Sequence, residues 1–236
     1  MPKTKNAPWY QTPEKLFELE IGWFIRRRYH KALKMSEQRL RDWLQPLRGL
    51  IPPVMATEEG RRSHLPFQIV MPKGRISLEQ GQYLEVDKDS PPVERLGLFH
   101  VENAPGVVTP PQPYLITDVS LATLKGSTIT EVIKYSDGPL RKLGRTPLTD
   151  QEGEAIKTIV FELLDEHTIQ LAGSRTCGGV GIACLAAHWE TKFPIVGYIA
   201  GDEDLEAIRE AIRRKHPNML KKPLFASCAS RLALPA

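Results

Sequence analysis

Apolar side chains recur at helical spacing in two stretches near the N-terminus of the chain. The first stretch predicts an amphipathic helix over residues 13–34, and its apolar stripe consists of Leu16, Leu19, Trp23 and Ile25. The second predicts a helix over residues 37–47, which begins after Ser36 because a serine hydroxyl can accept from a free backbone N–H. Its apolar face consists of Leu40, Trp43, Leu44 and Leu47, and Pro46 and the following Ile-Pro-Pro run end it. The short connection between them predicts a helical hairpin.

The pattern changes its period after residue 63, where short apolar runs are typical of β-strands. Strands are predicted over residues 65–72, 82–87, 95–103 and 113–120, with prolines and glycines between them. A short helix is expected to begin at Thr128 or Thr130 and to run through Tyr135.

Thr149 and Glu152 have the spacing of a capping box, in which each side chain bonds the free backbone amide of the other. They predict a helix that runs to about His167. Two strands follow over residues 168–176 and 180–188 around a glycine turn, and a third over residues 193–201. A last helix is predicted over residues 203–216, with Asp202 as its cap, Leu205, Ile208 and Ile212 on its apolar face and Pro217 after its end.

These elements predict an α+β fold, with an N-terminal helical hairpin followed by a mostly antiparallel sheet on which helices pack. We expect a helical segment over residues 1–50 and an α+β domain over residues 51–236, or one continuous domain. The 236 residues can bury a sizeable core, and 41% hydrophobic with 25% charged residues is ordinary for a globular protein. This composition excludes wholesale disorder.

The net charge of +4 is unevenly distributed along the chain. Much of the excess lies in residues 26–34 and 212–222, whereas acidic residues elsewhere dilute any basic face. Nucleic-acid binding usually needs a dense basic face, so a polyanionic partner is compatible with this charge but is not required by it.

The cysteine count and the N-terminal segment indicate the compartment. Three cysteines cannot all pair within one chain, which favours reduced thiols in the cytoplasm. Residues 1–16 carry early lysines without an apolar core after them, unlike a secretory signal. The longest run of small apolar residues, 180–187, is too short to span a bilayer. We therefore expect a soluble cytoplasmic protein without a membrane partner.

Cys177 is the candidate catalytic nucleophile. It lies in a glycine turn where a thiol can be exposed, and Arg175 is near enough to favour the thiolate. His188 and His167 are the nearest bases in the sequence. A free cysteine is more often packed as a small hydrophobe, and the same turn could instead bind an anion through its backbone amides, Arg175 and Arg231. A hairpin turn explains the glycines more simply.

A zinc site is the other chemistry that these residue types permit, with Cys177, Cys184, His188 and Cys228 as ligands. If residues 184–188 form a strand, its ends lie about 13 Å apart, too far to share one ion. Only a helix would bring Cys184 and His188 together. No metal or cofactor is therefore expected.

The basic stretch of the first helix is a candidate partner surface. Its residues mix cations with aromatic rings: Trp23, Arg26, Arg27, Arg28, Tyr29 and Lys31. Such a mixture suits an acidic protein surface or nucleic acid. A charge run of this kind is more often only the solvated face of an amphipathic helix.

Several motifs resemble, in their order, a bacterial family of domains of unknown function that bears the number fifty-seven-oh-one. They are GRTPLTDQEG, IQLAGSRTCGG, FPIVGYIAGD and ASCASRLAL, preceded by MSEQRLRDWLQPLR and LPFQIVM. The similarity runs from about Met35 to the C-terminus and implies no activity. It favours Cys177 and Cys228 over Cys184, and it places a ligand site at Ser174, Arg175, Cys177, Ser227, Cys228 and Arg231. The inserted Thr176 and the basic N-terminal helix depart from the family pattern.

No catalytic set is complete in this sequence. We therefore expect a non-enzymatic binding or assembly protein with a protein partner or self-association. One alternative is a small thiol-dependent enzyme or anion-binding domain that uses the Cys177 turn. The other is an accessory protein that binds nucleic acid through the basic N-terminal helix.

Overall fold

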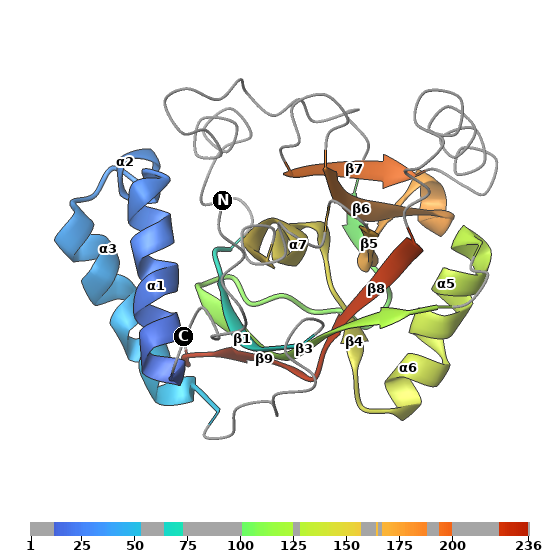
Figure 1. Ribbon diagram of the computed structural model, residues 1–236, viewed down its shortest axis with the longest axis horizontal. Helices are drawn as coiled ribbons and strands as arrows, with labels where there is room; N and C mark the ends of the chain where they lie inside the picture. The colour runs from blue at the N-terminus through green and yellow to red at the C-terminus, as the bar shows by residue number, and fades with distance from the viewer. Residues whose placement is uncertain are drawn as a thin grey trace, which may run out of the picture.

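The computed structural model describes residues 12–52, 64–72, 101–124, 128–156, 164, 167–187, 194–199 and 222–235. These residues form an α+β fold, as predicted, with helices at the N-terminus and a mostly antiparallel sheet (Figure 1). The predicted boundary between residues 50 and 51 is followed by β1, His64–Val70, which the N-terminal helices cover.

The N-terminal helices begin at the predicted positions but are shorter than predicted. Thr12 caps α1, Pro13–Arg26, and Ser36 caps α3, Glu37–Leu44, by accepting from Arg39 N at 3.1 Å. The single helix predicted over residues 13–34 is wrong, because Arg28 adopts a left-handed conformation (φ 61°) that no α-helix continues through. A separate turn, α2, Tyr29–Ala32, follows it. The 3₁₀-helix Gln45–Leu50 (η1) contains Pro46 and ends the unit.

The central strands follow in the order β1-β3-β8-β5-β6-β7, all antiparallel to their neighbours except the parallel pair β5 and β8. Three short strands join this sheet: β2 pairs with β5, β4 with β8, and β9 with β3. Their bounds, with those of the long strands, are β2 Glu102–Asn103, β3 Tyr114–Thr123, β4 Thr146–Pro147, β5 His167–Thr176, β6 Gly181–Ala187, β7 Pro194–Ile199, β8 Lys222–Cys228 and β9 Ser230–Ala233.

Most predicted strands are confirmed. The strand predicted over residues 65–72 is β1, that over 113–120 is β3, and those after the capping box are β5, β6 and β7. The strand predicted over residues 95–103 is described only at its end, as β2, and residues 82–87 lie outside the described part.

The helices of the second half differ in length from the prediction. Thr128 caps α5, Ile129–Asp137, which continues past Tyr135 and is followed by α6, Pro139–Lys142. The capping box starts α7, Asp150–Ile156, but His167 belongs to β5 and not to that helix. The helix predicted over residues 203–216 lies outside the described residues.

Three apolar clusters hold the layers together. One fills the space between α7 and the sheet and includes Tyr114, Leu171 and Cys228. A second joins α1 and α3 to Phe67 and Ile69 of β1, and a third lies beneath α5 and α6. Figure 1 accordingly places α7 in the middle of the molecule, with the N-terminal helices and the α5–α6 pair at opposite sides.

Candidate functional site

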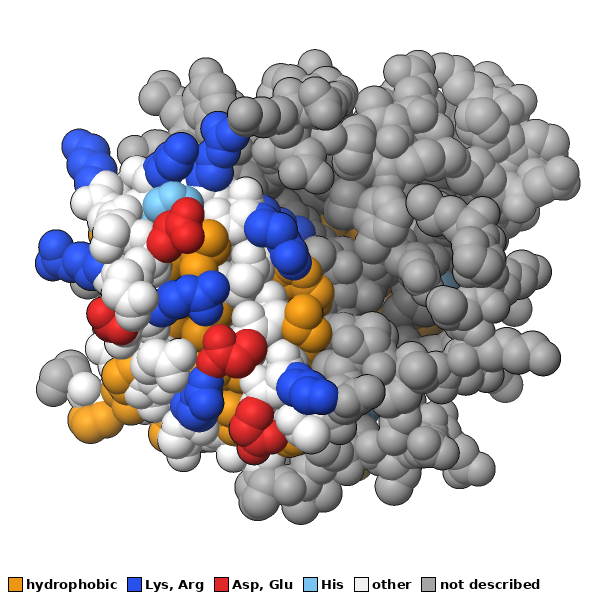
Figure 2. Space-filling view, turned by 60° about the vertical axis from the view of Figure 1, so that its left-hand side comes forward, with side chains coloured by type: hydrophobic (Ala, Val, Ile, Leu, Met, Phe, Trp, Pro, Cys, Tyr) orange, Lys and Arg blue, Asp and Glu red, His pale blue; other side chains and the backbone are white. Residues whose placement is uncertain are grey.

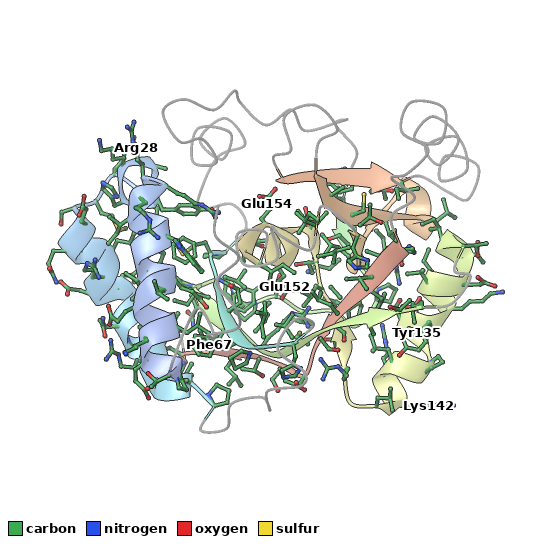
Figure 3. The ribbon with its side chains drawn as sticks, viewed as in Figure 1. Arg28, Phe67, Tyr135, Lys142, Glu152 and Glu154 are labelled. Atoms are coloured by element: carbon green, nitrogen blue, oxygen red, sulfur yellow. The ribbon has the colours of Figure 1, made fainter. Side chains whose placement is uncertain are left out.

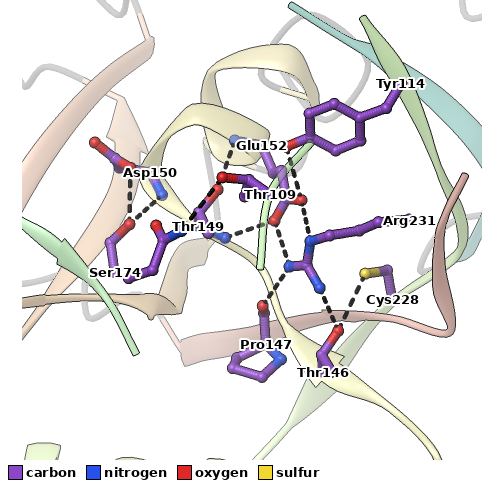
Figure 4. Close-up of polar contacts among 11 residues, drawn as sticks. Thr109, Tyr114, Thr146, Pro147, Thr149, Asp150, Glu152, Ser174, Cys228 and Arg231 are labelled. Carbon is purple, nitrogen blue, oxygen red and sulfur yellow. Dashed lines mark hydrogen bonds and ion pairs between the residues drawn. The ribbon is translucent and has the colours of Figure 1, made fainter. Parts of the chain in front are cut away.

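The first turn of α7 is the centre of a buried polar network (Figure 4). Thr149 N donates to Glu152 Oε2 at 2.8 Å, and Glu152 N donates to Thr149 Oγ1 at 3.3 Å. The predicted capping box is thus confirmed, and it orients the Glu152 carboxylate toward the sheet. Glu152 is completely buried, so its charge needs a partner inside the protein.

Arg231 of β9 is that partner. Its Nε donates to Glu152 Oε1 at 2.6 Å and its Nη2 to Oε2 at 2.7 Å, in the bidentate geometry that makes such pairs strong. Arg231 also donates to Thr146 Oγ1 at 2.5 Å and to the Pro147 carbonyl at 2.9 Å. Burial alone would lower the pKa of Arg231, but its hydrogen bonds and charge attraction to Glu152 raise it.

Tyr114 of β3 completes the shell of Glu152 by donating from its hydroxyl to Oε1 at 3.1 Å. Burial, and then the Glu152 charge, raise the pKa of this phenol. Each oxygen of Glu152 therefore accepts two hydrogen bonds, Oε1 from Tyr114 and Arg231 and Oε2 from Thr149 and Arg231. A carboxylate held in this way is saturated, and it is suited to fastening elements together and not to proton transfer.

Asp150, at the start of the same turn, makes a second set of contacts. Its backbone N–H donates to Ser174 Oγ at 2.8 Å, and the Ser174 hydroxyl donates back to Asp150 Oδ1 at 2.7 Å. Tyr198 of β7 donates to Asp150 Oδ2 at 3.1 Å. The first turn of α7 thus connects β5 and β7 through Asp150, and β3, β4 and β9 through Glu152.

The structure brings together three of the six predicted ligand residues. Ser174 and Arg231 bind the first turn of α7, and Cys228 joins them through Thr146, whose Oγ1 lies 3.6 Å from Cys228 Sγ. They converge because β5 and β8 end, and β9 begins, near the same helix turn.

Arg175 and Ser227 do not take part in this cluster. Their strand neighbours Ser174 and Cys228 face α7, and successive side chains of a strand point to opposite faces. Arg175 donates to Ser136 Oγ at 2.8 Å and to Asp137 Oδ1 at 2.9 Å, at the end of α5. The Ser227 hydroxyl accepts from Arg145 Nε at 3.1 Å.

The three cysteines have different surroundings. Burial raises the pKa of the Cys228 thiol to about 11, and the positive charge of Arg231 offsets only part of that effect. The backbone of Cys177 begins a 3₁₀ turn, η4, Cys177–Gly179, in which Gly178 and Gly179 have positive φ; its side chain lies outside the described part. Cys184 lies on β6, so the helix required for a zinc site with His188 is absent there, and His188 itself is not described.

No group of three or more His, Cys, Asp or Glu side chains that could hold a metal ion occurs among the described residues.

The six residues predicted as a partner surface lie at the end of α1 and in α2. Arg26, Arg28 and Lys31 are exposed, and Arg27 is half-buried. Figure 3 shows Arg28 at the tip of the helical unit, pointing away from the sheet. We call Arg26, Arg27, Arg28, Lys31 and Lys34 the basic tip.

Of the two aromatic residues beside the basic tip, Tyr29 packs against the apolar core. Tyr29 is half-buried in the cluster under the helices, with its ring edge-on to Phe24 at a centroid distance of 4.8 Å. Trp23 is half-buried. Below the tip, basic and acidic side chains alternate over the helical surface (Figure 2).

Sequence reasoning missed the acidic partners of this core. Asp150 and Tyr114 carried no motif of their own, and the pairing of Glu152 with Arg231 joins residues that are distant in the chain. Glu20 is the clearest omission, because it lies on the buried face of α1 with Phe17, Ile21 and Phe24. Its spacing of three and four residues from Phe17 and Phe24 was a signal for burial.

Comparisons with family models, with curated proteins and with solved structures each found no match. The resemblance to a bacterial family therefore stays a prediction. Within the described part of the chain, every helix is too short or too polar to cross a lipid bilayer.

Proposed function

We propose that this protein is a non-enzymatic binding or assembly protein, which contacts an acidic surface of a protein partner through the basic tip. One observation carries the proposal. Arg26, Arg28, Lys31 and Lys34 are exposed, and none of them forms an ion pair with another residue of the described part. Exposed cations without counter-charges attract a partner of opposite charge.

The backbone of the basic tip supports this proposal. Arg28 and Lys34 have φ values of 61° and 55°, and with Asp118 they are the non-glycine residues of the described part that have positive φ. Left-handed conformations of such residues cost about 1–2 kcal/mol each and concentrate at functional sites. These two residues bracket α2, whose residue Lys31 belongs to the basic tip.

The surroundings of the tip favour a protein over a nucleic acid. Glu14, Glu18, Glu37 and Asp42 are exposed on α1 and α3, so the helical face carries mixed charge below the tip. A phosphate backbone would meet repulsion there, whereas a protein surface can match mixed charge. The odd number of cysteines favours a reducing compartment, so we place the protein in the cytoplasm.

The family resemblance favours Cys177 and Cys228 as functional cysteines, but the structure argues against a nucleophilic role for Cys228. Cys228 of β8 is buried between the sheet and α7, and its thiol keeps its proton at neutral pH, unlike a nucleophilic thiolate. The enzyme or anion-binding role of the Cys177 turn stays a prediction.

Two doubly reversed variants of equal net charge test the proposal. Arg26→Glu/Lys31→Glu changes the basic tip, and Lys134→Glu/Lys142→Glu changes exposed lysines of α5 and α6 at the opposite side (Figure 3). Fluorescence anisotropy measures binding of labelled poly-glutamate and of single-stranded RNA of the same length, and circular dichroism verifies the fold. We expect the tip variant to lose about tenfold or more in affinity for poly-glutamate, with the control unchanged.

Equal loss in both variants, or none in either, would refute a specific role of the tip. Tighter binding of RNA than of poly-glutamate, with a steep loss on addition of salt, would replace the proposal with the nucleic-acid alternative. Sedimentation velocity of the same proteins tests self-association.

A further inference from the structure

Glu20 is an acidic residue on the buried, apolar face of the amphipathic helix α1. It lies in α1 on the side that packs against β1, and its exposed fraction is 0%. Its Oε2 accepts from Ile69 N at 2.6 Å and from Gln68 Nε2 at 3.0 Å. The carboxyl group therefore joins the helical unit to an edge strand of the sheet, within a cluster of leucine, isoleucine and phenylalanine side chains.

Two buried oxygens in this contact, Glu20 Oε1 and Gln68 Oε1, have no hydrogen-bond partner among the residues that the structure describes. Both are acceptors when Glu20 is ionised, so neither can satisfy the other. A proton on Oε1 changes this, because the hydroxyl then becomes a donor and the amide oxygen is the acceptor on the side chain already bonded to Glu20. Protonation at one site thus gives both oxygens a partner.

We propose that Glu20 is a neutral carboxylic acid in the folded protein, that its Oε1 hydroxyl donates to Gln68 Oε1, and that ionisation of this group loosens the attachment of α1 to β1. The acid and the amide then form a cyclic pair with two hydrogen bonds between them. The backbone N–H of Ile69 is a third bond to the same carboxyl group. This inference is independent of the partner proposed for the basic tip.

Several charged groups of the surrounding elements have partners other than Glu20. Arg41 of α3 and Arg48 of η1 pair with Glu18, on the exposed side of α1. Several other ionisable side chains on elements next to α1 or β1 also have partners: His30 with Glu37, His64 with Asp118, Tyr114 and Arg231 with Glu152, Asp150 with Ser174 and Tyr198, and Asp42 with Gln38. Arg39 of α3 is exposed. Burial raises the pKa of Glu20 well above its usual range, and the Ile69 N–H opposes this in part.

The protonation state predicts how stability depends on pH. The folded protein holds the Glu20 proton above the pH at which an unfolded chain releases it, near 4.5. Folding is then less favourable as pH rises from 4.5 to the folded pKa, because ionisation stabilises only the unfolded chain. Each pH unit in this window raises the unfolding constant by up to about tenfold, and the effect levels off above the folded pKa.

Glu20→Gln isolates this effect, because glutamine has the same shape and cannot ionise. Unfolding by urea at pH 5, 6 and 7 gives the ratio of unfolding constants, wild type over Glu20→Gln. We expect this ratio to rise by up to about tenfold per pH unit. Glu18→Gln, an exposed change on the same helix, keeps Glu20 and should follow the wild-type dependence. A constant ratio from pH 5 to 7 overturns the neutral acid.

Infrared spectroscopy of the wild-type protein tests the proposal without a variant, should Glu20→Gln fail to fold. A carbonyl band of a protonated carboxylic acid should persist at pH 7, and its absence would overturn the proposal. Hydrogen exchange tests the attachment itself: above the pH at which this carbonyl band disappears, the Ile69 amide and the α1 amides should exchange faster in the wild type than in Glu20→Gln, with no difference where the band persists. Equal exchange above that pH would overturn the loosening.

Discussion

Arg231 donates from Nε to Glu152 Oε1 at 2.6 Å and from Nη2 to Glu152 Oε2 at 2.7 Å, although the two residues are 79 positions apart in the chain. The glutamate caps α7 and the arginine belongs to β9, so this pair fixes the central helix to the last strand. Its position explains why both residues are buried: neither could be solvated without moving the helix off the sheet.

Removal of one member of this pair should be costly. Arg231→Met leaves the Glu152 carboxylate buried without its counter-charge, and we expect a loss of about 3–5 kcal/mol in the free energy of unfolding. Urea unfolding measures the loss. Arg48→Met, which breaks the exposed pair with Glu18, is the control and should cost at most about 1 kcal/mol. Similar losses in the two variants would show that burial does not govern the strength of the pair.

Cys228 should make stability depend on pH in the alkaline range. Burial raises the pKa of its thiol from 9.0 to about 11, so the unfolded chain loses this proton first. Stability from this group is complete below pH 9 and falls as pH rises toward 11, by at most about 2.7 kcal/mol. The free energy of unfolding should therefore fall less between pH 8 and pH 10.5 in Cys228→Ala than in the wild type.

Cys184→Ala is the matched control for this experiment, because it removes a half-buried thiol from β6 and leaves Cys228 in place. It should retain the wild-type pH dependence. The Cys228 thiol should also resist alkylation in the folded protein at pH 7.5, since with a pKa of about 11 only about one thiol in three thousand is ionised there. Rapid labelling of Cys228 without denaturant would contradict the raised pKa.

Gly173 is a position where only glycine fits. A Cβ there would lie 2.6 Å from the carbonyl atoms of Leu148, whose oxygen accepts from Gly173 N at 2.8 Å. Gly173→Ala should therefore push β5 away from this backbone and destabilise the protein by about 2–3 kcal/mol in thermal or urea unfolding.

Gly22→Ala is the opposite case in the same chain. A Cβ at Gly22 has nothing within 4 Å, and the residue lies inside α1. Alanine should stabilise the helix there by about 0.5–1 kcal/mol. Destabilisation by both substitutions would mean that the space around each glycine does not decide the outcome.

Glycine at position 28 should make the folded protein more stable than the native arginine does. Its φ of 61° strains an L-residue, so Arg28→Gly should be about 1 kcal/mol more stable than Arg28→Ala. Lys31 lies in the helix α2. The order should reverse there, with the Lys31→Ala variant more stable than the Lys31→Gly variant. If the basic tip binds as proposed, Arg28→Gly gains stability and loses affinity for poly-glutamate. The same order at both positions would contradict the strain at Arg28.

Local signals in the sequence predicted the starts of the elements well. Ser36 and Thr128 accept the backbone N–H groups that a cap should accept, and Thr149 forms its reciprocal box with Glu152. These interactions span three residues, so their geometry follows from the chain alone. The ends were harder, since nothing in the sequence marks Arg28 as left-handed.

The candidate site was predicted only in part, because side-chain direction depends on strand register. Ser174 and Arg231 do meet at the same helix turn, whereas Arg175 points to the other face, toward Asp137. A bulge in β5 between Leu171 and Arg175 shifts its pairing with β6. Gly173 within this segment is typical of a bulge, but a glycine does not show which neighbouring side chain faces α7. Which of two adjacent polar residues faces α7 was therefore beyond the reach of the pattern.

By itself the sequence determined the fold class, the helix caps, the alternation of the main strands and the mixed charge of the N-terminal helices. These depend on residues within a few positions of one another. Only the tertiary structure decided that Glu152 meets Arg231, that Cys228 is buried, and that Glu20 faces Gln68 across a helix and a strand. Such contacts join segments that the chain keeps far apart, and burial sets their protonation and strength only once the layers have packed.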